Sequence, residues 1–242
     1  MTRIQKAFTT IAASAVVVVL LFSAPTVTRA QTTNLATGQT ISLATIIDNG
    51  LHVQIGDKNF ADFSFLYGDN NGNALDDLTR SNVNLTALSN NIGFGLSFQQ
   101  PLLAIATATN NIVLKYTVTV TDPGFFISDI HLSITGSAGN GGHGTVVEYA
   151  AIGDFFPGLG IPVGQLVASI PGSSTDQANI LPPVIKLWVD KQVQVTGGTN
   201  ANGFASITII DQTFSQIPEP STMLLVGLGL LGAVAVKRMR KS

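Results

Sequence analysis

The chain has 242 residues, which leaves room for one ordinary domain with a sizeable core between two short end segments. Charged residues make up only 11%, the formal net charge is −2, and cysteine is missing from the sequence. This composition excludes disulfides, thiolate metal sites and cysteine nucleophiles. The abundance of Ile, Val, Leu and Phe argues against disorder.

The small net charge hides an uneven distribution. Seven of the twelve basic residues lie in the two end segments, and all fourteen acidic residues lie between these basic groups. Removal of both ends would therefore leave a charge of about −9. Nucleic acids and anionic membrane surfaces need a cationic partner, so both are disfavoured, whereas neutral glycans and cations remain open.

The N-terminus has the pattern of a secretory signal peptide. Arg3 and Lys6 form a short cationic region, and an apolar stretch over 11–24 follows. Small residues then favour cleavage after Ala30, which would make Gln31 the mature N-terminus. The alternative is an uncleaved signal anchor, which the short apolar stretch disfavours.

The region after the signal peptide is rich in strand signals. Apolar residues alternate with polar ones over 112–121 and again over 130–135, the period of half-buried strands. An Asp-Pro-Gly turn at 122–124 separates the two, so we expect a hairpin or two strands lying close together. Shorter strand-like runs occur at 39–47, 51–55, 60–67, 93–98, 145–151, 184–195 and 204–214.

These runs amount to roughly nine or ten strands, punctuated by Asn-Gly, Asp-Asn, Gly-Gly and Pro-Gly pairs, with no convincing amphipathic helix. Such spacing predicts an all-β fold of the β-sandwich or jelly-roll type. The glycine-rich stretch 136–142 lacks the Lys-Ser/Thr of a phosphate loop and is expected to be a mobile loop.

One loop has the oxygen-rich composition of a calcium site. Its candidate ligands are Asp69, Asn71, Asn73, Asp76 and Asp77. The loop departs from the EF-hand pattern, because its glycine is one place early and Arg80 stands where a bidentate Glu is required. A solvated polar loop is therefore the favoured interpretation, with calcium as the alternative and no other cofactor expected.

Asp129 and His131 are two apart on a predicted strand, so their side chains point to the same face. A carboxylate beside an imidazole suits metal binding or base catalysis, yet two ligands do not make a site, and a solvated outer face explains the pair as well.

Two further residues carry candidate chemistry. Glu148 follows two valines and could be a buried acid in a cleft, but the sequence places no second carboxylate beside it, as a glycosidase requires. Trp188 alternates with Leu187 and Val189, so it would be exposed for stacking on sugars if they face inward. Core or inter-sheet packing is the favoured interpretation of Trp188. No catalytic motif is present, and the chain is not expected to be an enzyme.

The C-terminus has three parts in fixed order: an extended Pro-Glu-Pro segment, an apolar run over 223–236 and a basic end. The two prolines disfavour helix, the apolar run fits a short membrane helix, and the basic end places the C-terminus in the cytoplasm. The motif residues are Pro218, Glu219, Pro220, Ser221 and Thr222, and the basic residues are Lys237, Arg238, Arg240 and Lys241.

This tail resembles the PEP-CTERM sorting domain. The resemblance implies recognition by an exosortase, a membrane-embedded enzyme that processes such tails, after a transient stay in the inner membrane. It also implies a final destination in the outer envelope or the extracellular matrix of a bacterium that makes exopolysaccharide.

We therefore expect a signal peptide at 1–30, an exported β-sandwich at 31–216 and a sorting tail at 217–242. The expected partners are signal peptidase and exosortase for processing, with exopolysaccharide as a ligand and nucleic acid excluded. The favoured function is a non-enzymatic envelope or matrix protein. The alternatives are a glycan-binding module and a hydrolase of matrix polysaccharide.

Overall fold

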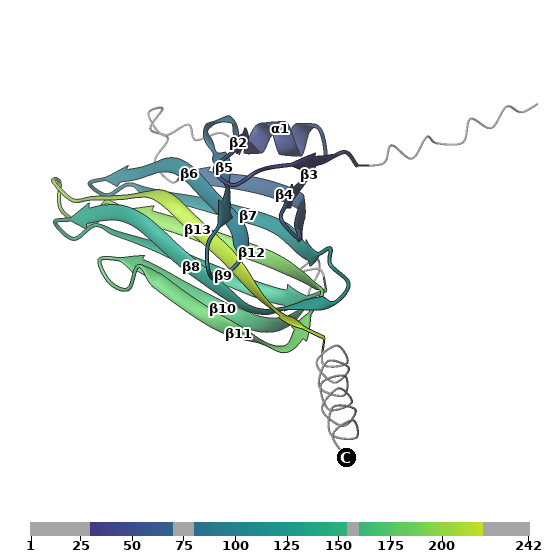
Figure 1. Cartoon of the computed structure of the whole chain (residues 1–242). Helices are drawn as coiled ribbons and strands as arrows, with labels where there is room; N and C mark the ends of the chain where they lie inside the picture. The colour runs from purple at the N-terminus through teal and green to yellow at the C-terminus, as the bar shows by residue number, and fades with distance from the viewer. Residues whose placement is uncertain (1–29, 70–79, 154–159, 220–242) are drawn as a thin grey trace, which may run out of the picture.

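The computed structural model describes residues 30–69, 80–153 and 160–219. In this part of the chain two β-sheets pack face to face, and a single short α-helix lies at one end of the layers (Figure 1). The predicted β-sandwich is therefore confirmed.

The seven-stranded sheet has the order β1-β3-β4-β7-β12-β9-β10. All its neighbouring strands are antiparallel except β1 and β3. Its strands are Thr32–Asn34 (β1), His52–Ile55 (β3), Lys58–Asp69 (β4), Thr109–Val120 (β7), Lys186–Thr196 (β12), His143–Ile152 (β9) and Ile161–Ile170 (β10).

The six-stranded sheet has the order β11-β8-β13-β6-β5-β2 and is antiparallel throughout. Its strands are Thr175–Val184 (β11), Phe125–Gly139 (β8), Phe204–Pro218 (β13), Phe94–Ile105 (β6), Asn84–Ser89 (β5) and Thr40–Ser42 (β2). A 3-10 turn, η2 (Arg80–Asn82), precedes β5.

The two most regular predicted strands, β7 and β8, do not form a hairpin. They belong to opposite sheets, so the Asp122–Gly124 turn carries the chain across the sandwich. The turn itself forms as predicted, with Gly124 N donating to Asp122 Oδ1 at 3.0 Å. Alternation tells which side chains face a core but not which strand lies alongside, and the hairpin expectation is wrong for that reason.

Two other local expectations are corrected. The run expected as a strand at 39–47 ends as a strand at Ser42, whose Oγ accepts from Thr45 N at 3.1 Å and starts helix α1 (Leu43–Asp48). The glycine-rich stretch 136–142 is no loop over its first half, because β8 continues through Gly139.

Strands β10 and β11 were not expected from the sequence. Both contain proline, which lacks the N–H needed by a central strand and weakens the strand signal. Each lies at the edge of its sheet, where a missing N–H donor is tolerated. The two strands are linked by a hydrogen bond in which Val167 N of β10 donates to Asp176 Oδ2 of β11 at 2.7 Å. These two edges therefore close one side of the sandwich.

The core contains a group of aromatic rings contributed by both sheets. Tyr116 of β7 lies 5.8 Å from Phe98 of β6, and Phe60 of β4 lies 5.9 Å from Phe214 of β13, measured between ring centroids. A register shift in β4 next to Asp62, whose φ is 56°, lets Phe63 stack on Tyr116 as well. Phe98 and Tyr116 lie beside the buried polar groups described below.

Candidate functional site

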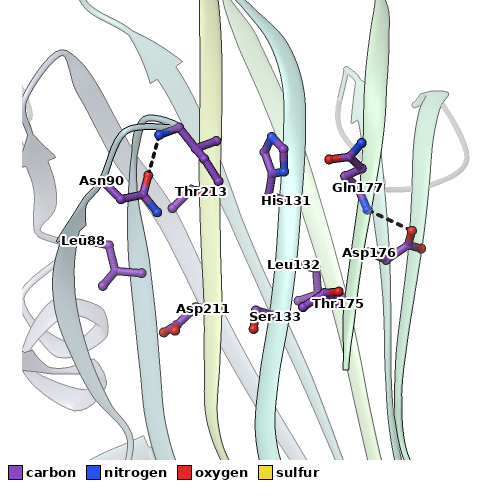
Figure 2. Close-up of a pocket in the computed structure, with 11 residues that line it drawn as sticks. Leu88, Asn90, His131, Leu132, Ser133, Thr175, Asp176, Gln177, Asp211 and Thr213 are labelled. Atoms are coloured by element: carbon purple, nitrogen blue, oxygen red, sulfur yellow. Dashed lines mark hydrogen bonds between the residues drawn. The ribbon is translucent and has the colours of Figure 1, made fainter. Parts of the chain in front are cut away.

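A groove of about 580 Å³ lies on the outer face of the six-stranded sheet, within the size range of ligand sites. Side chains of β5, β8, β11 and β13 and of the turn after β5 form its walls (Figure 2). The lining residues are Leu88, Asn90, Ile92, His131, Leu132, Ser133, Thr175, Asp176, Gln177, Asp211 and Thr213.

The predicted Asp129–His131 pair forms beside this groove. His131 Nε2 lies 2.7 Å from Asp129 Oδ1, and both side chains are half-buried on the outer face of β8. Ser215 Oγ of β13 lies 3.5 Å from the same ring nitrogen. A hydrolytic triad needs the acid and the nucleophile on opposite ring nitrogens, so this arrangement does not match one.

Asp211 carries an acceptor atom of the groove that has no partner among the described residues. It pairs in register with Ser133 across β13 and β8, and Figure 2 shows the two side chains next to each other. Its Oδ1 is buried and has no hydrogen-bond partner among the described residues. Asp211 was not predicted from the sequence, although its outward phase on the predicted strand was the signal that could have identified it.

Other polar groups of the groove are already engaged. Both carboxylate oxygens of Asp176 accept from backbone N–H groups, those of Val167 and Gln177, at 2.7 and 2.8 Å. Asn90 Oδ1 accepts from the N–H groups of Ile92 and Gly93 in the turn. The groups left for a ligand are therefore the imidazole, the hydroxyls, the Gln177 amide and the Asp211 carboxylate.

Glu148 is fully buried, as its valine neighbours suggested, but it faces the interior between the sheets instead of a cleft. Its cross-strand partner is Lys191 of β12, whose Nζ donates to Glu148 Oε2. The same Nζ donates to Gln212 Oε1 of the opposite sheet at 2.8 Å. Lys191 and Gln212 were missed in the sequence, where their inward phase among apolar residues was the available signal.

Burial dominates the titration of this cluster. Burial raises the pKa of Glu148, and interactions with Lys191 and Gln212 oppose part of this rise. Burial lowers the pKa of Lys191, opposed by Glu148. The pKa of Tyr116 rises well above its usual 10.0, first because of burial and second because of the Glu148 charge. Each shift favours the neutral form of its group.

Trp188 does not pack in the core, so the favoured interpretation from the sequence is wrong. Leu187 and Val189 face inward and are fully buried, which places Trp188 on the outer face of the seven-stranded sheet. There the Lys186 ammonium lies 4.3 Å from the centre of the indole ring and covers it in part. The side chain is half-buried, on the face opposite to the groove.

The calcium candidates lie outside the described side chains: only the backbone of Asp69, at the end of β4, is placed, and 70–79 are not described. Within the described part of the chain, no cluster of three or more His, Asp or Glu side chains could hold a metal ion.

The sorting motif begins inside the fold. Pro218 is the last residue of β13 and pairs with Phe125, which confirms the extended backbone predicted there, and Glu219 N donates to Gly124 O at 2.9 Å. Pro220 to Thr222, the apolar run and the basic end lie outside the described residues, as does the signal segment before Ala30. Over the residues that are described, no helix is long and apolar enough to cross a membrane.

Solved structures resemble the chain only distantly. The enzymatically active domain of tailspike protein 4 from bacteriophage CBA120 matches 63% of this chain over 19% of its own length, with 12% identity and a TM-score of 0.29. A family 32 carbohydrate-binding module of C. perfringens NanJ matches 62% of the chain over 93% of its own length, with 16% identity and a TM-score of 0.22. A family 11 module from Clostridium thermocellum matches 65% over 96%, with 13% identity and a TM-score of 0.22.

At such TM-scores nothing about binding or activity follows for this chain. No curated protein matches the sequence. The C-terminus is different, because residues 216–241 match the family model of the PEP-CTERM protein-sorting motif. The chain therefore carries a PEP-CTERM protein-sorting motif at its C-terminus, and this motif implies an exported protein that is sorted and processed by exosortase.

Proposed function

We propose that the exported sandwich is a non-enzymatic module that binds neutral polysaccharide in the groove of the six-stranded sheet, and that sorting delivers it to the outer envelope or the extracellular matrix. Before sorting, the tail would hold the protein in the inner membrane, with the signal peptide removed after Ala30. The observation that carries the proposal is the outward-facing groove whose available groups are hydroxyls, an amide, an imidazole and one carboxylate.

The chemistry of these groups suits sugar hydroxyls. A hydroxyl both donates and accepts, and Ser133, Thr213 and Gln177 offer both functions along one face. Asp211 adds an acceptor whose Oδ1 has no partner among the described residues. The lining residues include no Phe, Tyr or Trp, so the expected binding relies on hydrogen bonds beside an apolar wall that includes Leu88 and Ile92.

Charge favours a neutral polymer over an anionic one. The domain between the basic ends carries about −9, and the groove itself contains the Asp211 carboxylate without a basic side chain other than His131 among its lining residues. An anionic polysaccharide would be repelled by both.

The spacing of carboxylates supports binding over hydrolysis. Asp129 pairs with Ser215 and Asp211 pairs with Ser133, so the two acids are four residues apart along the sheet, about 13 Å at 3.3 Å per residue. Glycosidases hold their two carboxyl groups about 5 to 9.5 Å apart. Asp176, the third acid, has both oxygens bound to backbone N–H groups.

The test is affinity electrophoresis of the full chain in detergent, in gels that contain neutral or anionic matrix polysaccharide. We expect the neutral polymer to retard the wild type, and Asp211→Ala and Thr213→Val to migrate faster than the wild type in that gel. Gln192→Ala, an exposed change on the outer face of the other sheet, is the matched control and should behave as the wild type.

Equal retardation of wild type and both groove variants would contradict the groove as the binding site. Trp188→Ala addresses the opposite face: if it alone abolishes retardation, the ligand binds the outer face of the seven-stranded sheet instead. Absence of any retardation by neutral polymers would contradict the proposed ligand class.

A further inference from the structure

A lysine amine, a carboxyl group and a primary amide meet between the two sheets. Lys191 and Glu148 come from neighbouring strands of one sheet, and Gln212 comes from the other. The relative exposure of all three residues is 0%. Lys191 Nζ contacts the Glu148 carboxylate and lies 2.8 Å from Gln212 Oε1. These groups are a nucleophile, a proton carrier and an acyl donor.

We infer that Lys191 and Gln212 become joined by an amide bond inside the folded protein, with Glu148 carrying the proton. The Lys191 amine attacks Cδ of Gln212, forming the Nζ–Cδ bond. The Glu148 carboxylic acid gives its proton to Nε2 as the Cδ–Nε2 bond breaks and takes a proton from Nζ in return. One ammonia leaves, Glu148 is regenerated, and no oxidant or other co-reactant is consumed.

The fold supplies proximity for this reaction. Long antiparallel ladders fix β9, β12 and β13, so the amine and the amide are held against each other without further loss of freedom. Reactions between groups held in this way have effective molarities of about 10⁵ M or more when the alignment is good. The Phe98 ring, whose centroid is 5.8 Å from Lys191 Nζ, and the Tyr116 ring beside it keep the site apolar.

Burial also provides the protonation state that the reaction needs. An ammonium has no lone pair, so only a neutral amine can attack the amide carbon. Burial lowers the pKa of Lys191 and raises that of Glu148, so the pair is shifted toward a neutral amine beside a carboxylic acid. A carboxylic acid can then donate a proton to the leaving nitrogen.

The bond would also remove an unfavourable feature of the core. Glu148 Oε1 and Gln212 Nε2 are both buried, and neither has a hydrogen-bond partner among the described residues. An unpaired buried donor or acceptor is costly. Loss of Nε2 as ammonia eliminates one of the unpaired atoms, and the new amide N–H remains beside Glu148 as a donor.

A second lysine provides an internal comparison. Lys58 of β4 contacts Gln216 of β13 and bonds to Asp57 at 2.8 Å. The Asp57 side chain is 18% exposed and lies at the edge of the sandwich, next to Lys58 in sequence. Asp57 is therefore less buried than Glu148, so we restrict the inference to Lys191 and use Lys58 as the control.

The test is peptide mass mapping of the purified full chain. Cleavage before aspartate separates the two residues, because Asp190 precedes Lys191 and Asp211 precedes Gln212. We expect the peptides that begin at these aspartates to remain joined and to lack the mass of one ammonia. Cyclisation of an N-terminal glutamine also releases ammonia, but it would leave these peptides separate.

Substitutions of Glu148, Gln212 and Lys58 test the role of each side chain in forming the amide bond. Glu148→Gln keeps the size of the side chain but cannot accept a proton, and Gln212→Met removes the acyl donor; both should give separate peptides of full mass. Lys58→Met should still give the joined pair. Separate, full-mass peptides from the folded wild type would overturn the bond whatever the variants do, and a joined pair in Glu148→Gln would overturn the role of Glu148.

Discussion

Successive residues of β13 serve two different polar environments. Asp211 and Thr213 face the open groove, whereas Gln212 between them faces the sealed cluster with Lys191 and Glu148. The groove is open to solvent, although Asp211 Oδ1 itself is buried and Thr213 is only 5% exposed. In the interior, each unpaired polar atom costs about 1–3 kcal/mol, so the same kinds of side chain act on stability instead. Substitutions in the interior should therefore mainly lower stability, whereas substitutions in the groove should mainly weaken ligand binding.

The largest effect is expected inside. Glu148→Ala leaves the Lys191 amine buried without an acid and without a route to the proposed amide bond. Removing one member of such a buried pair costs about 3–5 kcal/mol. Urea unfolding followed by circular dichroism should show this loss.

A double variant tests whether the cost comes from the buried amine that is left without a partner. Glu148→Leu combined with Lys191→Met replaces both groups by apolar side chains, which commonly recovers most of the stability. If the double variant is as unstable as Glu148→Ala, the loss comes from disturbed packing instead. The expectation that buried polar groups of the interior determine stability would then be contradicted.

The next largest effect on stability is expected where β6 approaches β13, the strand that contributes to both environments. A Cβ on Gly95 of β6 would lie 1.8 Å from the Gln212 carbonyl oxygen, so Gly95→Ala must push β6 away from β13. Overpacking of this kind costs about 1–3 kcal/mol, and we expect polysaccharide binding to fall as well. Gly68→Ala, which meets no atom within 4 Å, is the control, and equal stability of the two variants would contradict the close approach.

Alkaline titration tests how well the interior is sealed. The pKa of Tyr116 is raised in the folded state, so its contribution to stability is present below the unfolded value near 10.0 and is lost as pH rises through the folded value. The ultraviolet change of Tyr116, isolated by comparison with Tyr116→Phe, should accompany unfolding. At high pH, Tyr116→Phe should be more stable by about 1 kcal/mol. Ionisation of Tyr116 in the folded protein would show that water reaches the cluster.

The smallest effect on stability is expected in the groove. Asp211 is half-buried on the outer face, and its Oδ1 has no partner among the described residues. Asp211→Ala should therefore change the free energy of unfolding by only about 0.5 kcal/mol while it weakens polysaccharide binding. A loss comparable to that of Glu148→Ala would show that Asp211 is structural.

The sequence predicted β8, β9, β12 and β13, but it missed β5 and β11, which also line the groove, and it did not show how the strands meet. The alternation of β7 and β8 predicted their inward and outward residues, including the Asp129–His131 pair. Which strands are neighbours depends on contacts distant in sequence, so the groove between β8 and β13 and the Lys191–Gln212 contact could not be derived. The helix after Ser42 and the proline-containing edge strands were missed because short local signals there conflict with the tertiary structure.

Whether the groove holds the sorted protein in the matrix can be measured in the protein's own host. Wild type, Asp211→Ala and the wild type in a strain without exosortase are separated into inner membrane, outer envelope and matrix fractions. We expect the wild type in the matrix and, in the strain without exosortase, in the inner membrane. Asp211→Ala should be processed normally but washed out of the matrix. Equal retention of wild type and Asp211→Ala would contradict the groove as the site that holds the sorted protein there.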